Sequence, residues 1–211
     1  VESSSLTSCL IQQHVNESVI NNLTVRELLR YASRFKNGLN QSIDEIDQFI
    51  GKTINELLLD QNVLDRFYGI CSGGEQKRIA IGQELMCHRK PSFLFIDEPT
   101  TGLDSVSALN VITVLKQLAN NYRMTVITSI HVPNSRTLDL FDKLYILAKE
   151  GVCIYSGCPK GIKHYLDEKI ELTISEAKKP IEEISFLQVV KELKVLGEEV
   201  RSSPYRAHHE L

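Results

Sequence analysis

The sequence predicts an α/β fold in which a parallel sheet carries helices on its faces. Two short apolar runs without alternation, at 92–96 and 124–129, are typical of strands buried on both faces of a parallel sheet. Each run is followed by a segment of helical character, at 105–121 and near 134–141. This alternation of strand and helix favours parallel pairing. A chain of 211 residues with 42% hydrophobic content is long enough to build a core.

The amino-terminal part predicts one strand and two capped helices. The strand lies around TSCLIQ, at 7–12. Thr24 with Glu27, and Ser42 with Glu45, have the spacing of capping boxes. The apolar residues at helical spacing in the first helix are assigned to the core: Leu28, Leu29, Ala32 and Phe35. The second helix carries its own apolar set: Ile46, Phe49, Ile50, Ile54, Leu57 and Leu58.

The stretch CSGGEQKR, at 71–78, predicts a third helix start that could face an anion. Ser72 is a good N-cap, and Glu75 completes a capping box. Gly73 and Gly74 let the backbone approach a ligand closely. The free N–H groups at a helix start favour negative charge. A plain capped helix would explain the same residues.

The stretch FLFIDEPTTGLD, at 93–104, predicts two carboxylates at the end of a buried strand. Asp97 and Glu98 would lie at the carboxyl edge of the sheet, where open α/β folds bind ligands, and Pro99 ends the strand. A carboxylate that holds Mg²⁺ beside one that activates water suits phosphoanhydride hydrolysis. For the pair alone, a solvated strand end is the alternative.

These motifs together resemble those of ATP-binding cassette (ABC) ATPases. CSGGEQKRIAIGQEL is similar to the signature motif and its helix, and FLFIDEPTTGLDS to the Walker B strand and D-loop. His131, in VITSIH, resembles the switch histidine, and Gln12 or Gln13, in SCLIQQH, the Q-loop glutamine. The runs LTVRELL and VCIYSGCPKGIKHYL are similar to the G subfamily of half-transporters.

The resemblance implies a P-loop NTPase fold and a transport-coupled ATPase that uses ATP and Mg²⁺. Residues 1–168 would form the nucleotide-binding domain, with a helical subdomain at about 24–90, and 169–211 a charged linker. The implied partners are a second nucleotide-binding domain, identical or different, and the transmembrane domain of the same transporter. The implied place is the cytoplasmic face of a membrane, and the implied activity is export of a lipid-like or small hydrophobic substrate.

The resemblance also assigns roles to residues. Glu98 would be the general base and His131 its catalytic companion, while Asp97 and Gln12 would approach the metal. The signature would contact the γ-phosphate of ATP held by a partner subunit. The implied nucleotide-binding positions are Gln12, Asp104 and the signature residues Ser72, Gly73 and Gly74. Asp104 or Ser105 could equally be a helix N-cap.

No G-x-x-x-x-G-K-[ST] motif occurs in the sequence. We interpret the chain as a fragment that lacks the amino-terminal, P-loop part of its domain, and we expect the isolated chain to be inactive. The missing part would neighbour strand 92–96, so an open edge and exposed apolar surface are expected. Two alternatives remain open: a catalytically silent cassette that regulates an intact subunit, and a non-transport ABC ATPase of the DNA-repair or translation-factor kind.

Composition narrows the remaining possibilities. A net charge of −3 with scattered basic residues argues against nucleic acid as a partner. The five cysteines lack metal-site spacing and are interpreted as free thiols. No run approaches the roughly 18 apolar residues of a membrane span. The stretch 143–157 predicts a hairpin, and 186–200 an amphipathic helix within the linker, either a linker helix or a partner-binding face.

Overall fold

The computed structural model describes residues 7–12, 21–131, 133, 135–147 and 153–167. The predicted linker at 169–211 and Gln13 lie outside these residues. The chain divides into two compact units, Val1–Leu140 and Phe141–Leu211. The prediction of one domain over 1–168 therefore stays a prediction, and each unit is described by itself.

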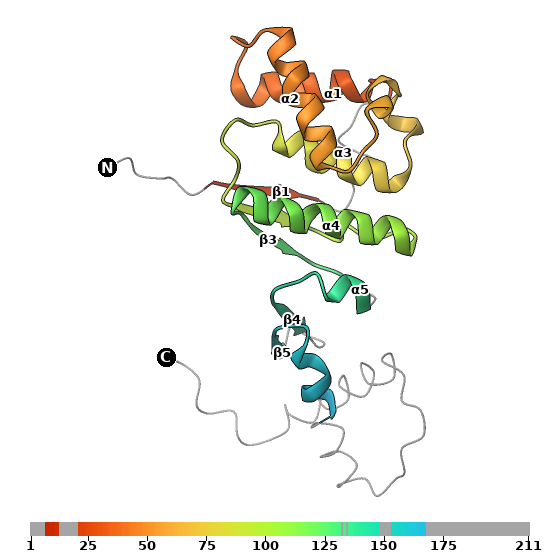
Figure 1. Cartoon of the computed structure of the whole chain (residues 1–211), viewed down its shortest axis with the longest axis vertical. Helices are drawn as coiled ribbons and strands as arrows, with labels where there is room; N and C mark the ends of the chain where they lie inside the picture. The colour runs from red at the N-terminus through yellow and green to blue at the C-terminus, as the bar shows by residue number, and fades with distance from the viewer. Residues whose placement is uncertain (1–6, 13–20, 132, 134, 148–152, 168–211) are drawn as a thin grey trace, which may run out of the picture. The chain divides into compact units, whose positions relative to one another are not determined.

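The first unit contains a three-stranded parallel sheet, as the sequence predicts (Figure 1). Its strands are β1 (Ser8–Ile11), β2 (Phe93–Ile96) and β3 (Thr125–Thr128), in the order β1-β2-β3. Because β2 is paired on both sides, the open edge expected beside it is not found there. The helix α4 (Ser105–Tyr122) connects β2 to β3, and the short α5 (Ser135–Leu138) follows β3.

The sheet is covered on one face only within the described residues. Leu94 and Ile96 of β2 are buried, whereas Phe95 between them is 38% exposed. Leu10 and Ile127, in register with Phe95 on the neighbouring strands, are 62% and 48% exposed. The expectation of burial on both faces is thus wrong for β2. The expected exposed apolar surface is present, as a row on a face of the sheet.

The helices between β1 and β2 form a layer of their own (Figure 1). They are α1 (Val25–Asn37), α2 (Ile43–Glu56), the 3₁₀ turns η1 (Gln61–Asp65) and η2 (Tyr68–Ile70), and α3 (Gly73–Leu85). All three α-helices begin with the predicted capping boxes, at Thr24, Ser42 and Ser72. The core of this layer is made of fully buried aliphatic side chains, among them Val25, Leu29, Ile50, Ile54, Leu57, Ile79 and Leu85.

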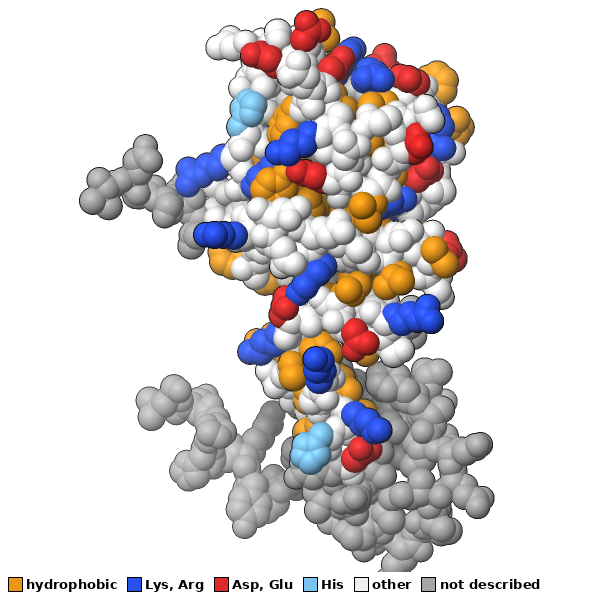
Figure 2. Space-filling view, viewed as in Figure 1, with side chains coloured by type: hydrophobic (Ala, Val, Ile, Leu, Met, Phe, Trp, Pro, Cys, Tyr) orange, Lys and Arg blue, Asp and Glu red, His pale blue; other side chains and the backbone are white. Residues whose placement is uncertain are grey.

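Side-chain pairs join the three helices. Arg30 of α1 donates to Asp47 of α2, with 2.7 Å from Nε to Oδ1, and Lys36 pairs with Glu84 of α3 at 2.7 Å. Two residues of the predicted apolar helix sets are exposed: Phe35 by 88%, and Leu58, which lies beyond the end of α2, by 48%. Acidic and basic side chains are interspersed on the face seen in Figure 2.

The second unit contains the predicted hairpin. Strands β4 (Leu144–Leu147) and β5 (Cys153–Gly157) pair antiparallel, and residues 161–167 are helical. The rings of Tyr155 and Tyr165 lie 5.2 Å apart and fasten this helix to the hairpin. The described residues include no helix with the length and apolar character that crossing a membrane requires. All five cysteines are free thiols, as predicted.

Candidate nucleotide site

The carboxyl edge of the sheet brings together residues from three separate parts of the chain. Ile11, Ile96 and Thr128 are in register at the ends of the strands. The pairing continues one residue further, because the Asp97 N–H donates to the Ile11 carbonyl at 3.0 Å and the Ser129 N–H to that of Ile96 at 3.3 Å. Parallel strands end at one edge, so the residues that follow them start side by side. Gln12 follows Ile11, is exposed, and therefore lies at this edge beside Asp97.

Ser129 links the two carboxylate residues. Its Oγ donates to Asp97 Oδ1 at 2.6 Å and accepts the Glu98 N–H at 3.0 Å. Sequence reasoning missed this serine. The one available signal was its place directly after an apolar strand, because polar residues at parallel strand ends converge at the same edge.

Glu98 has an unusual backbone and a fixed side chain. Its φ is 44°, in the left-handed region that non-glycine residues rarely adopt. The Thr101 Oγ1 donates to Glu98 Oε2 at 2.7 Å, and the Thr101 N–H donates to the Glu98 carbonyl at 3.3 Å. The turn after β2 therefore holds this carboxylate at the sheet edge. His131 follows Ser129 by two residues and is exposed, so it leaves β3 at the same edge.

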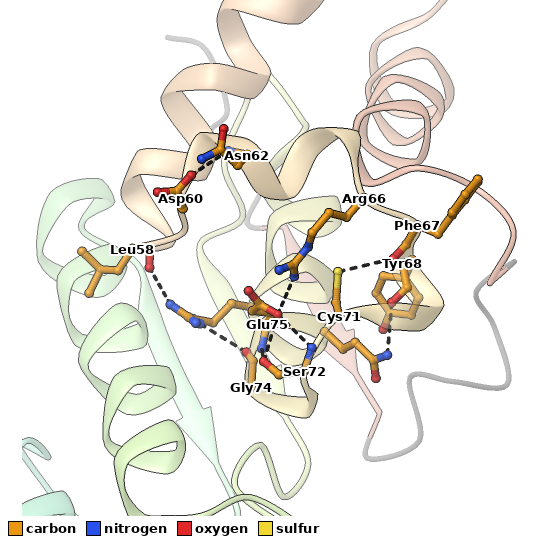
Figure 3. A network of polar contacts seen from close by, with 12 residues as sticks. Leu58, Asp60, Asn62, Arg66, Phe67, Tyr68, Cys71, Ser72, Gly74 and Glu75 are labelled. Carbon is orange, nitrogen blue, oxygen red and sulfur yellow. Dashed lines mark hydrogen bonds and ion pairs between the residues drawn. The ribbon is translucent and has the colours of Figure 1, made fainter.

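The signature helix begins with a closed polar network (Figure 3). The Ser72 N–H and Oγ donate to Glu75 Oε2 at 2.8 and 3.0 Å, and Ser72 Oγ accepts the Glu75 N–H at 3.4 Å. Arg66 donates to the same Glu75 oxygen at 2.6 Å. Burial alone would raise the pKa of the Glu75 carboxyl, but the hydrogen bonds from Ser72 and Arg66 outweigh it and leave the pKa below its usual value. Glu75 thus stays ionised and holds the helix start.

A second arginine, Arg78, joins this helix to its neighbour. Arg78 Nη1 donates to the carbonyls of Leu57 and Leu58, at 3.2 and 2.6 Å, at the end of α2. Leu58 has a φ of 54°. The carbonyls at a helix end lack intrahelical partners, so a cation there stabilises both the carbonyls and the helix dipole.

The two signature glycines meet the start of α4 in the same chain. A Cβ at Gly74 would lie 3.0 Å from the Ser107 Cβ, and one at Gly73 would lie 3.1 Å from Leu103 Cδ2. Their missing side chains therefore serve close packing as well as any approach to a ligand. The N–H groups of Gly73 and Gly74 belong to the first turn of α3, where an α-helix offers no partner of its own.

Asp104 is the N-cap of α4. Its Oδ1 accepts the N–H groups of Val106 at 2.9 Å and Ser107 at 3.0 Å. Hydrogen bonds from Ser107 are the main cause that lowers the pKa of this carboxyl. The cap alternative is thus observed, while contact with a second subunit stays a prediction.

A lysine of α3 lies within electrostatic range of the carboxylate pair. Burial lowers the pKa of Lys77, and the charges of Glu98 and, to a lesser degree, Asp97 oppose this effect. The charge of Lys77 on the signature helix is therefore influenced by the strand-end carboxylates of the same chain. This electrostatic influence was not predicted, because it depends on how α3 packs in the fold.

The donor set fits Mg²⁺ as part of a coordination shell. The described residues contain no cluster of three histidine, cysteine or acidic side chains that could enclose a metal. Asp97 and Gln12 nevertheless offer hard oxygen ligands at one edge, and Mg²⁺ is usually held by one or two carboxylates together with phosphate and water. The tripeptide GKT at 51–53 is no phosphate loop, because it lies inside α2 and the buried Thr53 donates its hydroxyl to the Phe49 carbonyl at 3.0 Å.

Residues 3–101 match the family model for ABC transporters. The chain is 38% identical over 163 residues to ABC transporter G family member 14 of Arabidopsis thaliana, which covers 74% of this chain and 24% of that protein. It is 38% identical over 183 residues to G family member STR2 of Medicago truncatula, covering 84% of this chain and 24% of that protein. The mouse broad substrate specificity ATP-binding cassette transporter ABCG2 is 37% identical over 154 residues, covering 71% and 23%.

A solved structure shares the fold. CbiO1 from Clostridium perfringens, described as part of the ABC transporter complex cbiONQ, superposes with a TM-score of 0.61 at 21% identity. The superposition covers 81% of this chain and 65% of that chain. The predicted α/β fold with a parallel sheet, like that of P-loop NTPases, is therefore confirmed. The chain spans about a quarter of the length of the curated relatives described above.

Proposed function

Since this chain carries a nucleotide-binding domain of the ABC transporter family, similar to those of the G family, we propose that it serves ATP-driven transport across a membrane. The observation that carries the proposal is the sheet edge, where Asp97 and Glu98 follow β2 and are held by Ser129, which follows β3, and by Thr101 in their own turn. The proposed substrate is lipid-like or a small hydrophobic compound. The proposed partners are a transmembrane domain of the same transporter, on its cytoplasmic side, and a second nucleotide-binding domain.

We propose a role in ATP hydrolysis for each residue at the sheet edge and for the residues at the start of α3. Asp97 and Gln12 offer oxygen atoms to Mg²⁺, which when bound would neutralise charge on the phosphates of ATP. Glu98 accepts the proton of the attacking water at its carboxylate, and His131 keeps that water and carboxylate aligned. Ser72, Gly73 and Gly74 donate hydrogen bonds to the γ-phosphate of ATP held by the partner domain.

The base role of Glu98 can be tested in the complete protein. Glu98→Gln should lower ATP turnover by about 10²- to 10⁴-fold, because an amide cannot accept the proton. Glu45→Gln is the matched control, since it makes the same change at an exposed capping box on α2. Turnover that stays at the wild-type level in Glu98→Gln would remove Glu98 from this role.

The second candidate function is a catalytically silent role, in which the chain pairs with and regulates an intact cassette; residues 1–211 contain no P-loop motif. We propose that residues 1–211 alone do not hold ATP firmly for the same reason. Thermal unfolding of the purified chain with millimolar Mg²⁺ and ATP tests this, and no shift is expected. A clear shift that Asp97→Asn weakens would show that the chain binds nucleotide by itself.

If the silent role holds, association with an intact cassette should require ATP. Analytical ultracentrifugation of this chain with an intact G-family nucleotide-binding domain measures that association. Gly73→Asp should abolish it by placing a negative charge at the γ-phosphate, while Gly51→Asp on α2 carries the same charge at a remote position. Equal association of both variants would argue against the signature as the contact.

A further inference from the structure

Ser129, which directly follows β3, makes two hydrogen bonds that converge on the Walker B residues after β2. Its backbone is fixed to β2 through the Ile96 carbonyl at 3.3 Å. From this fixed point its Oγ donates to Asp97 Oδ1 at 2.6 Å and accepts the Glu98 N–H at 3.0 Å. A single hydroxyl thus uses its proton on one carboxylate residue and a lone pair on the other. The bond to Asp97 is short, as expected for a hydroxyl that donates to an ionised acceptor.

The hydrogen bonds of Ser129 explain how the unusual backbone conformation of Glu98 is held. A glutamate with a φ of 44° persists only where its surroundings define the conformation. The surroundings here are Ser129 Oγ on the Glu98 N–H and Thr101 on the Glu98 carbonyl and carboxylate. Because Ser129 directly follows β3, its hydroxyl connects the orientation of Glu98 to the sheet and not only to its own turn.

We propose that Ser129 is a positioning residue for ATP hydrolysis, which holds the Asp97 carboxylate and the Glu98 backbone in one geometry. This inference rests on the proposed function, in which Asp97 holds Mg²⁺ and Glu98 is the base. The Ser129 proton occupies one Asp97 oxygen and so fixes how the carboxylate presents its other oxygen to the metal. Groups that orient a metal ligand in this way typically change metal affinity by about 10- to 100-fold when they are removed.

Amide hydrogen exchange in the purified chain tests the geometry without any nucleotide. In Ser129→Ala the Glu98 amide loses its acceptor, and its exchange should become about tenfold faster or more. The Asp97 amide, which donates to Ile11, should exchange as in the wild type and is the internal control. Ser129→Thr keeps a hydroxyl at the same atom and should restore protection of Glu98. Unchanged exchange at Glu98 in Ser129→Ala would overturn the inference.

Binding of Mn²⁺, used alone as a probe for the Mg²⁺ site, tests the consequence. Water-proton relaxation should show about tenfold weaker binding in Ser129→Ala and near wild-type binding in Ser129→Thr. Asp97→Asn defines the loss of the ligand itself, and thermal unfolding checks that Ser129→Ala remains folded. Wild-type Mn²⁺ affinity in a folded Ser129→Ala would overturn the positioning role. If neither the wild type nor any variant binds Mn²⁺ and the exchange effect is present, Ser129 still positions Glu98, and Asp97 does not hold a divalent cation in the absence of nucleotide.

Discussion

Thr101 holds the carboxylate of Glu98 from within its own turn. The 2.7 Å bond from Thr101 Oγ1 fixes one carboxylate oxygen, and the residue is exposed. Thr101→Val removes the hydroxyl while keeping the shape, so it should lower ATP turnover of the complete protein by about 10- to 100-fold through misplacement of the base. The free energy of unfolding should change by less than about 1 kcal/mol, since an exposed hydrogen bond contributes little.

Steady-state turnover and urea unfolding of the same samples separate the two effects. Thr113→Val in α4 is the matched control, because its hydroxyl donates to the Leu109 carbonyl at 2.8 Å, within its own helix. If Thr101→Val hydrolyses ATP as fast as Thr113→Val, the Thr101 bond has no part in positioning Glu98.

Some residues of the site could be predicted from the sequence around them, whereas others are brought to the site only by the fold. Asp97 and Glu98 could be predicted, because a carboxylate pair after an apolar run has a definite place in a parallel sheet. Ser129 and Lys77 could not, because their approach depends on strand register and on the packing of α3. Thr101 lies within the stretch FLFIDEPTTGLD that the sequence analysis singled out. Its hydrogen bond to Glu98 nevertheless depends on the left-handed backbone of Glu98, which the sequence pattern does not predict.

At the scale of elements, the packing of α3 against α2 depends on Gly82. A Cβ at this position would lie 2.7 Å from Leu57 Cδ1, and the Leu57 side chain is fully buried. Gly82→Ala should therefore destabilise the chain by about 1 to 3 kcal/mol, because close-packed interiors resist an added methyl group. Gly51→Ala, also inside a helix but with nothing within 4 Å, should instead stabilise it by about 0.5 to 1 kcal/mol.

Chemical denaturation of the two variants gives the signs directly. Adding Leu57→Val to Gly82→Ala removes the Leu57 Cδ1 atom that the new Cβ would contact. The double variant should therefore recover part of the lost stability. Stabilisation of Gly82→Ala by as much as Gly51→Ala would show that Leu57 moves aside freely and that the close approach of the helices is not needed.

Helix starts were predictable from the sequence, while helix faces were less so. The three capping boxes are local, so the spacing of Thr24, Ser42 and Ser72 to their glutamates identified each start. Phe35 was assigned to the core because it continues an apolar spacing, but it lies near the end of α1 and is 88% exposed. The 3₁₀ turns η1 and η2 were not predicted, since they lack the periodicity of an amphipathic helix.

At the scale of the molecule, the apolar row on the sheet explains why one pattern misled. The run FLFI has the composition of a strand covered on both faces, and the described residues cover one. Leu10, Phe95 and Ile127 form a continuous row across three strands, because parallel register places them side by side. The apolar composition of a strand therefore indicates that both of its faces could be buried. Which face is actually covered is seen only in the assembled sheet.

Stability of the chain should have an acid and an alkaline limit with different causes. Hydrogen bonds from Thr24, Ser42 and Ser72 lower the pKa of Glu27, Glu45 and Glu75, although burial opposes them and is the largest single effect at Glu75. A carboxyl whose folded pKa is depressed stabilises the fold above its unfolded value of about 4.5, and this contribution is lost as pH falls below that value.

The alkaline limit depends on Cys9 of β1. Burial and the hydrogen bond to Glu84 raise the pKa of this thiol from 9.0 to about 12. Between these values the unfolded chain releases the proton while the folded chain keeps it, so stability falls as pH rises from about 9 to about 12. Cys9→Ala removes this linkage and should flatten the alkaline slope of the unfolding free energy.

Urea unfolding between about pH 8 and 11 measures that slope, with the exposed Cys153→Ala as control. An equally steep slope in Cys9→Ala would assign the alkaline loss to other groups, of which the buried Tyr68, with a pKa raised to about 12 by burial, is the first candidate.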